Sequence, residues 1–149
     1  MAEPTPEAYH YPLLIKHILE YGVSRAPKKE IVYRDLVRYT WHDFYHDRIK
    51  RLARALEDLG IRPGMKVGVL DFDTHRYLEL FYAIPMMGAV LHTINLRLPP
   101  EWILHTIRHA EDDVLVVRDE LVPLVEKVKD KLPPSVKFFI IGSDKGEMP

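Results

Sequence analysis

Four short apolar runs divide the second half of the chain: "KVGVLDF", "AVLHTI", "DVLVV" and "VKFFII". The segments between them, residues 75–87, 101–110 and 121–132, have the apolar spacing of helices. Strands that alternate with helices predict crossover connections and a mainly parallel sheet with helices on both faces. The predicted fold class is therefore α/β, a three-layer open sheet of about four strands, each expected to be buried on both faces.

The N-terminal part of the chain predicts a helix and then a β-hairpin. In "LLIKHILEYGVSRAP" apolar residues recur at helical spacing, and Gly22 followed by Pro27 is expected to end that helix. The stretch "EIVYRDLVRYTW" contains two short runs rich in Val, Ile, Tyr and Thr. They predict a hairpin whose turn lies around residues 34–36.

A long amphipathic helix is predicted to follow the hairpin. Thr40 is expected to cap it, with Asp43 as the acidic member of a capping box, and Gly60 is expected to end it. The apolar stripe of this helix consists of Tyr45, Ile49, Leu52, Ala53, Leu56 and Leu59. The basic residues expected on its solvated face are Arg48, Lys50, Arg51 and Arg54.

Length and composition fit one globular domain. The chain has 149 residues, of which 47% are hydrophobic and 29% charged, which is typical of a folded protein. We expect a leader at residues 1–12, a folded unit at 13–143 and a frayed tail at 144–149. The leader lacks the basic and apolar regions of a signal peptide. The apolar run at 77–94 is interpreted as a helix and a strand divided at Gly88 rather than a transmembrane segment.

Charge and cysteine content exclude several classes of function. The formal net charge is -1, so the chain lacks the basic excess of a nucleic-acid-binding protein. Cysteine is absent, which excludes disulfides, thiolate zinc sites and cysteine nucleophiles and fits a cytoplasmic protein. The sequence contains no Walker A motif, no glycine-rich dinucleotide turn and no Gly-x-Ser-x-Gly motif.

Asp71 and Asp73 are the strongest candidates for chemistry. They end an apolar strand in "GVLDFDTH", where a haloacid-dehalogenase-type phosphatase would place its nucleophile and general acid around Mg²⁺. Against that interpretation, a helix follows at once, and the acidic pair Asp112 and Asp113 precedes a strand instead of ending one. The alternative interpretation is that Asp73 or Thr74 caps the following helix.

Two histidine groups are weaker candidates for a metal site. His42 and His46 lie four residues apart and share one face of a helix, but no third ligand is evident. His109 lies near Glu111 and Asp112, where the end of a helix in a polar turn explains the residues equally well.

A series of landmarks resembles one enzyme family. They are "YTW" at the start of a helix, "RLARAL", "LGIRPG", "KVGVL", "MMGAVLHTINLRL" and "HAEDDVLVV", in this order. The sequence from about residue 11 to about residue 142 is similar to the N-terminal region of acyl-CoA ligases of the adenylate-forming superfamily. The forms "LDFDTHRYLE" and "HAED" look most like the branch that activates medium- and long-chain fatty acids.

The resemblance implies ATP, Mg²⁺ and coenzyme A as cofactors of a whole ligase. The family's phosphate loop, its magnesium and ribose motifs and its catalytic lysine have no counterpart here, so no catalytic, cofactor-binding or metal-binding residue is assigned. The resemblance therefore implies that this chain is a structural framework whose partner is the remainder of a ligase. Alone, the chain is expected to be inactive. A homodimer through an uncovered sheet or helix face, or a non-catalytic interaction module, is the alternative. The module's patch would comprise Phe72, Ile94, Leu96 and Leu98.

Overall fold

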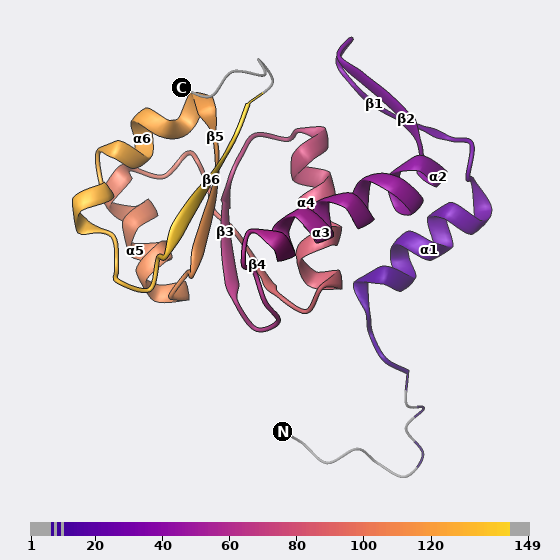
Figure 1. Cartoon of the computed structure of the whole chain (residues 1–149), viewed down its shortest axis with the longest axis horizontal. Coiled ribbons are helices and arrows are strands. Elements are labelled where there is room, and N and C mark those ends of the chain that lie inside the picture. Colours follow the sequence, from indigo (N-terminus) through magenta and orange to yellow (C-terminus); the bar gives the residue numbers. More distant parts are fainter. Residues whose placement is uncertain (1–6, 8, 10, 144–149) are drawn as a thin grey trace.

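The computed structural model describes residues 7, 9 and 11–143. The predicted tail at 144–149, and residues 1–6, 8 and 10 of the predicted leader, lie outside the described residues. A four-stranded parallel sheet forms the centre of the molecule, in the order β4-β3-β5-β6 (Figure 1). Its strands are β3 (Lys66–Leu70), β4 (Val90–Thr93), β5 (Val114–Arg118) and β6 (Phe138–Gly142).

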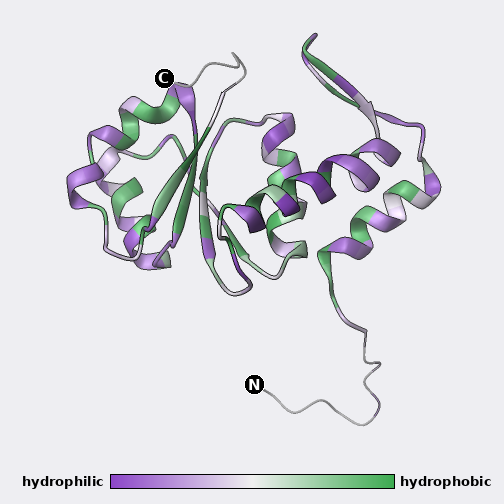
Figure 2. Cartoon of the chain, viewed as in Figure 1, coloured by the Kyte–Doolittle hydropathy of each residue, from purple (hydrophilic) through white to green (hydrophobic). Residues whose placement is uncertain are grey.

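Helices cover both faces of this sheet, which confirms the predicted three-layer α/β fold. The helices on one face are α3 (Ile49–Asp58) and α4 (His75–Met86). Those on the other face are α5 (Pro100–Ala110) and α6 (Val122–Glu126), at the left of Figure 1. Figure 2 shows hydrophobic colour concentrated on the strands and hydrophilic colour on outward parts of the helices. None of the described helices is both long and apolar enough to cross a bilayer.

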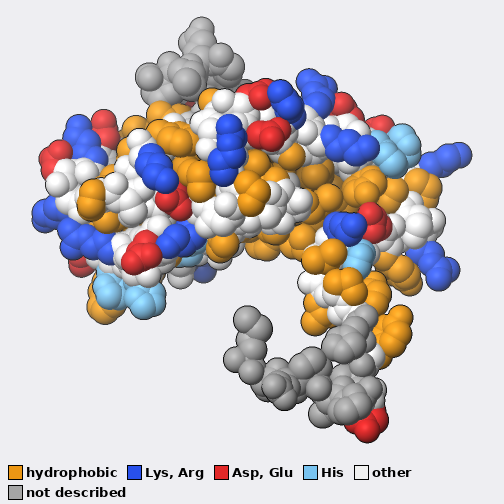
Figure 3. All heavy atoms as spheres, turned by 60° about the horizontal axis from the view of Figure 1, so that its bottom comes forward, with side chains coloured by type: hydrophobic (Ala, Val, Ile, Leu, Met, Phe, Trp, Pro, Cys, Tyr) orange, Lys and Arg blue, Asp and Glu red, His pale blue; other side chains and the backbone are white. Residues whose placement is uncertain are grey.

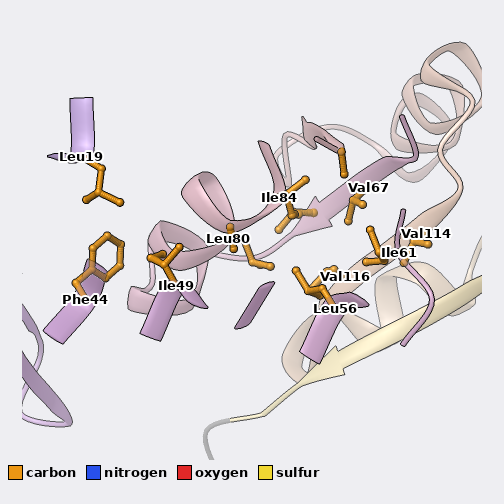
Figure 4. Packing of buried hydrophobic residues seen from close by; sticks show 13 residues of the cluster. Leu19, Phe44, Ile49, Leu56, Ile61, Val67, Leu80, Ile84, Val114 and Val116 are labelled. Carbon is orange, nitrogen blue, oxygen red and sulfur yellow. The ribbon is translucent and has the colours of Figure 1, made fainter. Parts of the chain in front are cut away.

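Alternation along the two central strands sends side chains into two separate apolar clusters. On the side of α3 and α4, the strand residues are Val67, Val69, Val114 and Val116, shown in part in Figure 4. On the side of α5 and α6, they are Leu70, Leu115 and Val117. Full burial of each such side chain contributes about 1.5–3 kcal/mol. The two clusters fix the register of β3 against β5.

The two edge strands are less buried than the sequence predicted. Both central strands are buried almost throughout, but Val90 of β4 and Phe139 of β6 are exposed. The expectation that all four strands are buried on both faces is therefore wrong for β4 and β6. An edge strand has a neighbour on one side only, and the short helix α6 leaves part of β6 uncovered.

The N-terminal elements pack beside α4, away from β6. They are α1 (Ile15–Arg25), the hairpin strands β1 (Glu30–Tyr33) and β2 (Val37–Thr40), the short helix α2 (Trp41–Asp43) and a π-helical turn, η1 (Phe44–Arg48). The hairpin and the capping box between Thr40 and Asp43 are confirmed. Phe44 is completely buried and lies among aromatic rings from these elements and α4.

Three expectations about helices were wrong. Helix α1 continues through Gly22 and ends at Arg25, two residues before Pro27. Leu59 is exposed, because the apolar stripe of the long helix ends at Leu56. The helix expected at 121–132 is divided into η2 (Asp119–Leu121), α6 and η3 (Lys129–Lys131).

Candidate functional site

The carboxyl ends of β3 and β4 border a crevice with a volume of about 500 Å³. Ligands of open α/β sheets commonly bind at this edge. The crevice is lined by Asp71, Phe72, Asp73, Tyr77, Ile94, Asn95, Leu96 and Arg97. Both carboxylates that the sequence singled out therefore lie at the location expected of a ligand site, and their contacts decide what they do there.

The Asp71 side chain forms hydrogen bonds within the turn that follows β3. Its Oδ1 accepts a hydrogen bond from the backbone N–H of Phe72 at 2.7 Å, and its Oδ2 accepts one from the Thr74 hydroxyl at 2.8 Å. The Arg118 guanidinium lies 3.8 Å away. Burial raises the pKa of Asp71 above its ordinary value, although these partners act in the opposite direction. The carboxylate therefore stabilises a turn and a buried arginine.

Thr74, not Asp73, is the cap of α4. Its hydroxyl oxygen accepts a hydrogen bond from the backbone N–H of Tyr77 at 3.1 Å, which is the usual geometry of an N-cap. The same hydroxyl donates to Asp71, so one side chain links the strand end to the helix start. Asp73 is exposed on the loop between them. The cap interpretation of the "DFDT" segment is thus supported at Thr74.

The acidic pair Asp112 and Asp113 lies at the opposite edge of the sheet. Asp113 accepts a hydrogen bond from the backbone N–H of Lys66, the first residue of β3, at 2.8 Å. Asp71 follows the last residue of that strand. The two acidic pairs are consequently separated by the length of β3, and the arrangement required for the phosphatase is not assembled.

Neither histidine candidate becomes part of a three-ligand group within the described residues. The rings of His42 and His46 lie 4.5 Å apart, whereas the His109 ring stacks on His105. Glu111 instead pairs with Lys66, and Asp112 pairs with His92. Within the part of the chain that the structure describes, no group of three His, Cys, Asp or Glu side chains could hold a metal ion.

A second cavity, of about 190 Å³, lies between the sheet and helices α3 and α4. Its apolar residues include Leu52, Leu80 and Ile140, and its charged residues are Asp71, Arg76, Glu79 and Arg118. Sequence reasoning missed Glu79 and Arg118, which are only 6% exposed. Both occur in segments that otherwise have an apolar pattern, and a charge at a core position was the available signal.

Glu79 joins three elements at the edge of this cavity. It accepts a hydrogen bond from the Tyr39 hydroxyl at 3.3 Å and forms an ion pair with Arg48. The Arg48 guanidinium also lies over the Tyr39 ring, 4.7 Å from its centroid. Burial, followed by the charge of Glu79, raises the pKa of Tyr39 to about 12. The expectation that Arg48 belongs to a solvated face was therefore wrong, because a buried carboxylate holds it.

Residues 19–148 match the family model of AMP-binding enzymes, which is most of the chain. The chain belongs to this family. It is 39% identical over 131 residues to the long-chain-fatty-acid–CoA ligase of Thermus thermophilus, covering 85% of the chain and 24% of that protein. It is 32% identical over 128 residues to the medium-chain-fatty-acid–CoA ligase of Ectopseudomonas oleovorans, covering 86% and 23%.

Solved structures of related ligases share this fold. An anthranilate–CoA ligase in complex with anthranoyl-AMP superimposes with a TM-score of 0.76 at 27% identity, covering 89% of the chain and 26% of that structure. A fatty acyl-CoA synthetase of Mycobacterium tuberculosis shares the fold, with a TM-score of 0.78 at 23% identity over 87% of the chain and 26% of that structure. The chain spans about a quarter of the length of the two bacterial fatty-acid–CoA ligases.

Acidic side chains at both edges of the sheet contact other groups of the protein. The loop from β3 to α4 contains no glycine and is closed by Asp71 and Thr74 contacts. The carboxylates at the other sheet edge are bonded to Lys66, His92 and Lys137. In this member of the AMP-binding enzyme family, Asp71, Asp112 and Asp113 hold strand ends and the start of a helix in place.

Proposed function

We propose that this chain is the N-terminal framework of an ATP-dependent, AMP-forming ligase for medium- or long-chain fatty acids. The observation that carries the proposal is the 39% identity to a long-chain-fatty-acid–CoA ligase over 85% of the chain. In the whole enzyme, a fatty acid and ATP form an acyl-adenylate and pyrophosphate, and coenzyme A then displaces AMP to form the acyl-CoA. The proposed compartment is the cytoplasm.

The contacts of three charged side chains support the proposed framework role. Asp71 stabilises the turn before α4, Glu79 holds Arg48, and Asp113 joins the starts of neighbouring strands. A side chain that already holds two partners in a buried place is poorly available for ATP or Mg²⁺. The proposal therefore assigns adenylation and thioester formation to other parts of a ligase, and no turnover to this chain alone.

Pyrophosphate release tests the absence of activity. The chain is incubated with ATP, Mg²⁺, coenzyme A and either a medium-chain or a long-chain fatty acid, with the Thermus thermophilus ligase as the active control. We expect release of pyrophosphate only in the control. Fatty-acid-dependent turnover by the chain itself would contradict the proposal.

A chimera tests the framework role directly. Residues 19–143 replace the matching segment of the Thermus thermophilus ligase, and thioester formation is measured at saturating fatty acid. We expect an active chimera, and a similar turnover per folded molecule when it carries Asp71→Asn, because the proposal gives that carboxylate a part in the fold and none in the reaction. A chimera that folds but forms no acyl-adenylate would refute the assignment.

A non-catalytic interaction module is the second candidate, favoured by one observation. Phe72 is 45% exposed beside the carboxyl-edge crevice, whereas Ile94 of the expected patch is buried and Leu96 and Leu98 are partly buried. Light scattering across a range of concentrations tests self-association through this edge. A size that rises with concentration in the wild type and not in Phe72→Gln would favour a homodimer over a monomeric framework.

A further inference from the structure

Helix α1 has an apolar stripe that faces away from the rest of the molecule. Its inward side is anchored by Leu19, which is 1% exposed. On the outward side, Leu14, Ile18 and Tyr21 follow one another at helical spacing, and the exposed fractions of Ile18 and Tyr21 are 67% and 65%. A helix that is apolar on two sides has a second surface to cover.

A basic cluster continues this stripe at its C-terminal end. Arg25, Lys28 and Lys29 are all exposed, and the Arg25 guanidinium lies 5.4 Å from the centroid of the Tyr21 ring. No acidic side chain within the described residues forms an ion pair with any of the three.

The nearest acidic residues in the sequence have partners elsewhere. Glu20 is the sole carboxylate in α1, and it accepts a hydrogen bond from the Tyr45 hydroxyl at 3.0 Å. Glu30 pairs with Arg38 across the hairpin at 2.6 Å. The positive charge beside the apolar stripe is therefore not neutralised by its own neighbours.

Backbone hydrogen bonds fix the basic cluster relative to the helix. The N–H of Lys29 donates to the Ala26 carbonyl at 3.0 Å, and the N–H of Trp41 donates to the Lys29 carbonyl at 2.9 Å. The N–H of His42 donates to the Pro27 carbonyl at 3.0 Å. The stripe and the basic residues thus form one preorganised surface, which we call the α1 surface: Leu14, Ile18, Tyr21, Arg25, Lys28 and Lys29.

We propose that the α1 surface binds the surface of an anionic lipid bilayer. Leucine, isoleucine and tyrosine side chains suit the boundary between headgroups and acyl chains, and lysine and arginine are attracted by anionic headgroups. Figure 3 shows hydrophobic side chains, with Lys, Arg, His and acidic side chains among them, on the side of the molecule from which α1 projects. Figure 1 places α1 at the opposite end of the molecule from α5 and α6.

A second copy of the chain fits this surface less well. In a twofold dimer the same patch meets itself, so the basic clusters of both copies would approach each other. Like charges that face each other oppose such an interface. An anionic bilayer instead supplies the opposite charge and an apolar layer at once. The proposal is independent of the ligase assignment.

Vesicle co-sedimentation tests the proposal with the chain itself. One set of vesicles contains equal parts of phosphatidylcholine and phosphatidylglycerol, and the other contains phosphatidylcholine alone. We expect binding to the anionic vesicles, weakened by added salt, and little binding to the neutral ones. Removal of each basic residue is expected to weaken partitioning roughly fivefold.

Two variants and two matched controls locate the binding surface. Ile18→Gln with Tyr21→Gln removes the stripe, and the triple change of Arg25, Lys28 and Lys29 to Gln removes the charge. Trp102→Gln removes an exposed aromatic side chain on α5, and the triple change of Lys127, Lys129 and Lys131 to Gln removes the same charge at α6 and η3. Circular dichroism verifies that each variant is folded.

Loss of at least tenfold in partitioning for the two α1 variants, with the controls unchanged, would support the proposal. It is overturned if the wild type does not bind anionic vesicles, or if the α6 and η3 control loses as much binding as the α1 triple variant. Light scattering tests the alternative of a dimer. If the wild type forms concentration-dependent dimers and the stripe variant does not, the α1 surface binds a second copy of the chain instead of a bilayer.

Discussion

The carboxylate of Asp112 lies 2.8 Å from Nδ1 of His92, and the contact passes over Gly68. His92 belongs to β4 and Asp112 precedes β5, whereas Gly68 lies on β3 between those two strands. The Asp112 side chain is fully buried and the His92 side chain is 23% exposed. The pair therefore ties two strands together across a third, which is possible because residue 68 has no side chain.

Gly68→Ala tests the space that this contact needs. A Cβ atom at residue 68 would lie 2.7 Å from Oδ2 of Asp112 and 2.7 Å from a Leu115 methyl carbon, so both must move. We expect the free energy of unfolding to fall by about 1–3 kcal/mol, measured by urea denaturation. Gly142→Ala on β6 is the control, because its Cβ would meet no atom within 4 Å. Equal effects of the two substitutions would contradict this account.

A double-mutant cycle tests whether Asp112 and His92 stabilise the fold as a pair. Asp112→Asn replaces the buried carboxylate by an amide. His92→Phe removes Nδ1, the ring nitrogen that contacts Asp112. We expect each single variant to lose about 1–2 kcal/mol and the double variant to lose less than their sum, with a coupling of about 1 kcal/mol. Urea unfolding of the four proteins gives the coupling directly. Strict additivity would show that the contact has no energetic role.

The sequence was sufficient to predict the order of strands and helices, because that order is encoded in short, local sequence patterns. Hydrophobic periodicity predicted the order of strands and helices, and the Thr40 and Asp43 spacing predicted a cap that the structure contains. Contacts between distant residues were not predictable in the same way. Glu79 and Arg48 meet 31 positions apart, and nothing beside either residue in the sequence indicates the other. The capping interpretation of the segment with Asp71 and Asp73 was favoured from the sequence, but the short pattern did not show whether Asp73 or Thr74 is the cap.

Glu79→Gln tests the buried ion pair with Arg48. Glu79 is almost fully buried, so replacement by a neutral amide leaves the guanidinium with a weaker partner and the Tyr39 hydroxyl with a changed one. We expect a loss of about 1–3 kcal/mol in the free energy of unfolding. Arg51→Gln, which breaks an exposed pair with Asp47, should change it by less than about 0.5 kcal/mol. The reverse ranking in urea denaturation would show that Glu79 is not a structural anchor.

Acid unfolding tests the role of Asp113. Burial acts to raise its pKa, but the N–H of Lys66 and the ammonium of Lys137 outweigh it, so the pKa of Asp113 lies below its ordinary 3.8. The native state thus favours the charged form, and the resulting stability is present above pH 3.8 and lost as pH falls through the lower folded pKa. Asp113→Asn should reduce stability at neutral pH by about 1 kcal/mol and lessen its further loss below pH 3.8. An unchanged acid limb in urea titrations at several pH values would reject this assignment.

Substitutions at the start of α4 test whether this segment is a helix cap or an acidic active site. Thr74→Ala removes the oxygen that accepts the Tyr77 N–H and the hydroxyl that donates to Asp71, so we expect a loss of about 1–2 kcal/mol. Thr74→Ser keeps both hydrogen bonds and should recover most of that loss. Asp73→Ala, on the exposed loop beside it, should have little effect on unfolding. If Asp73→Ala instead lowers the free energy of unfolding as much as Thr74→Ala does, the aspartate is the cap. The hydrogen bonds of Asp71 within the turn would then no longer explain why this strand end is not a phosphate-binding site.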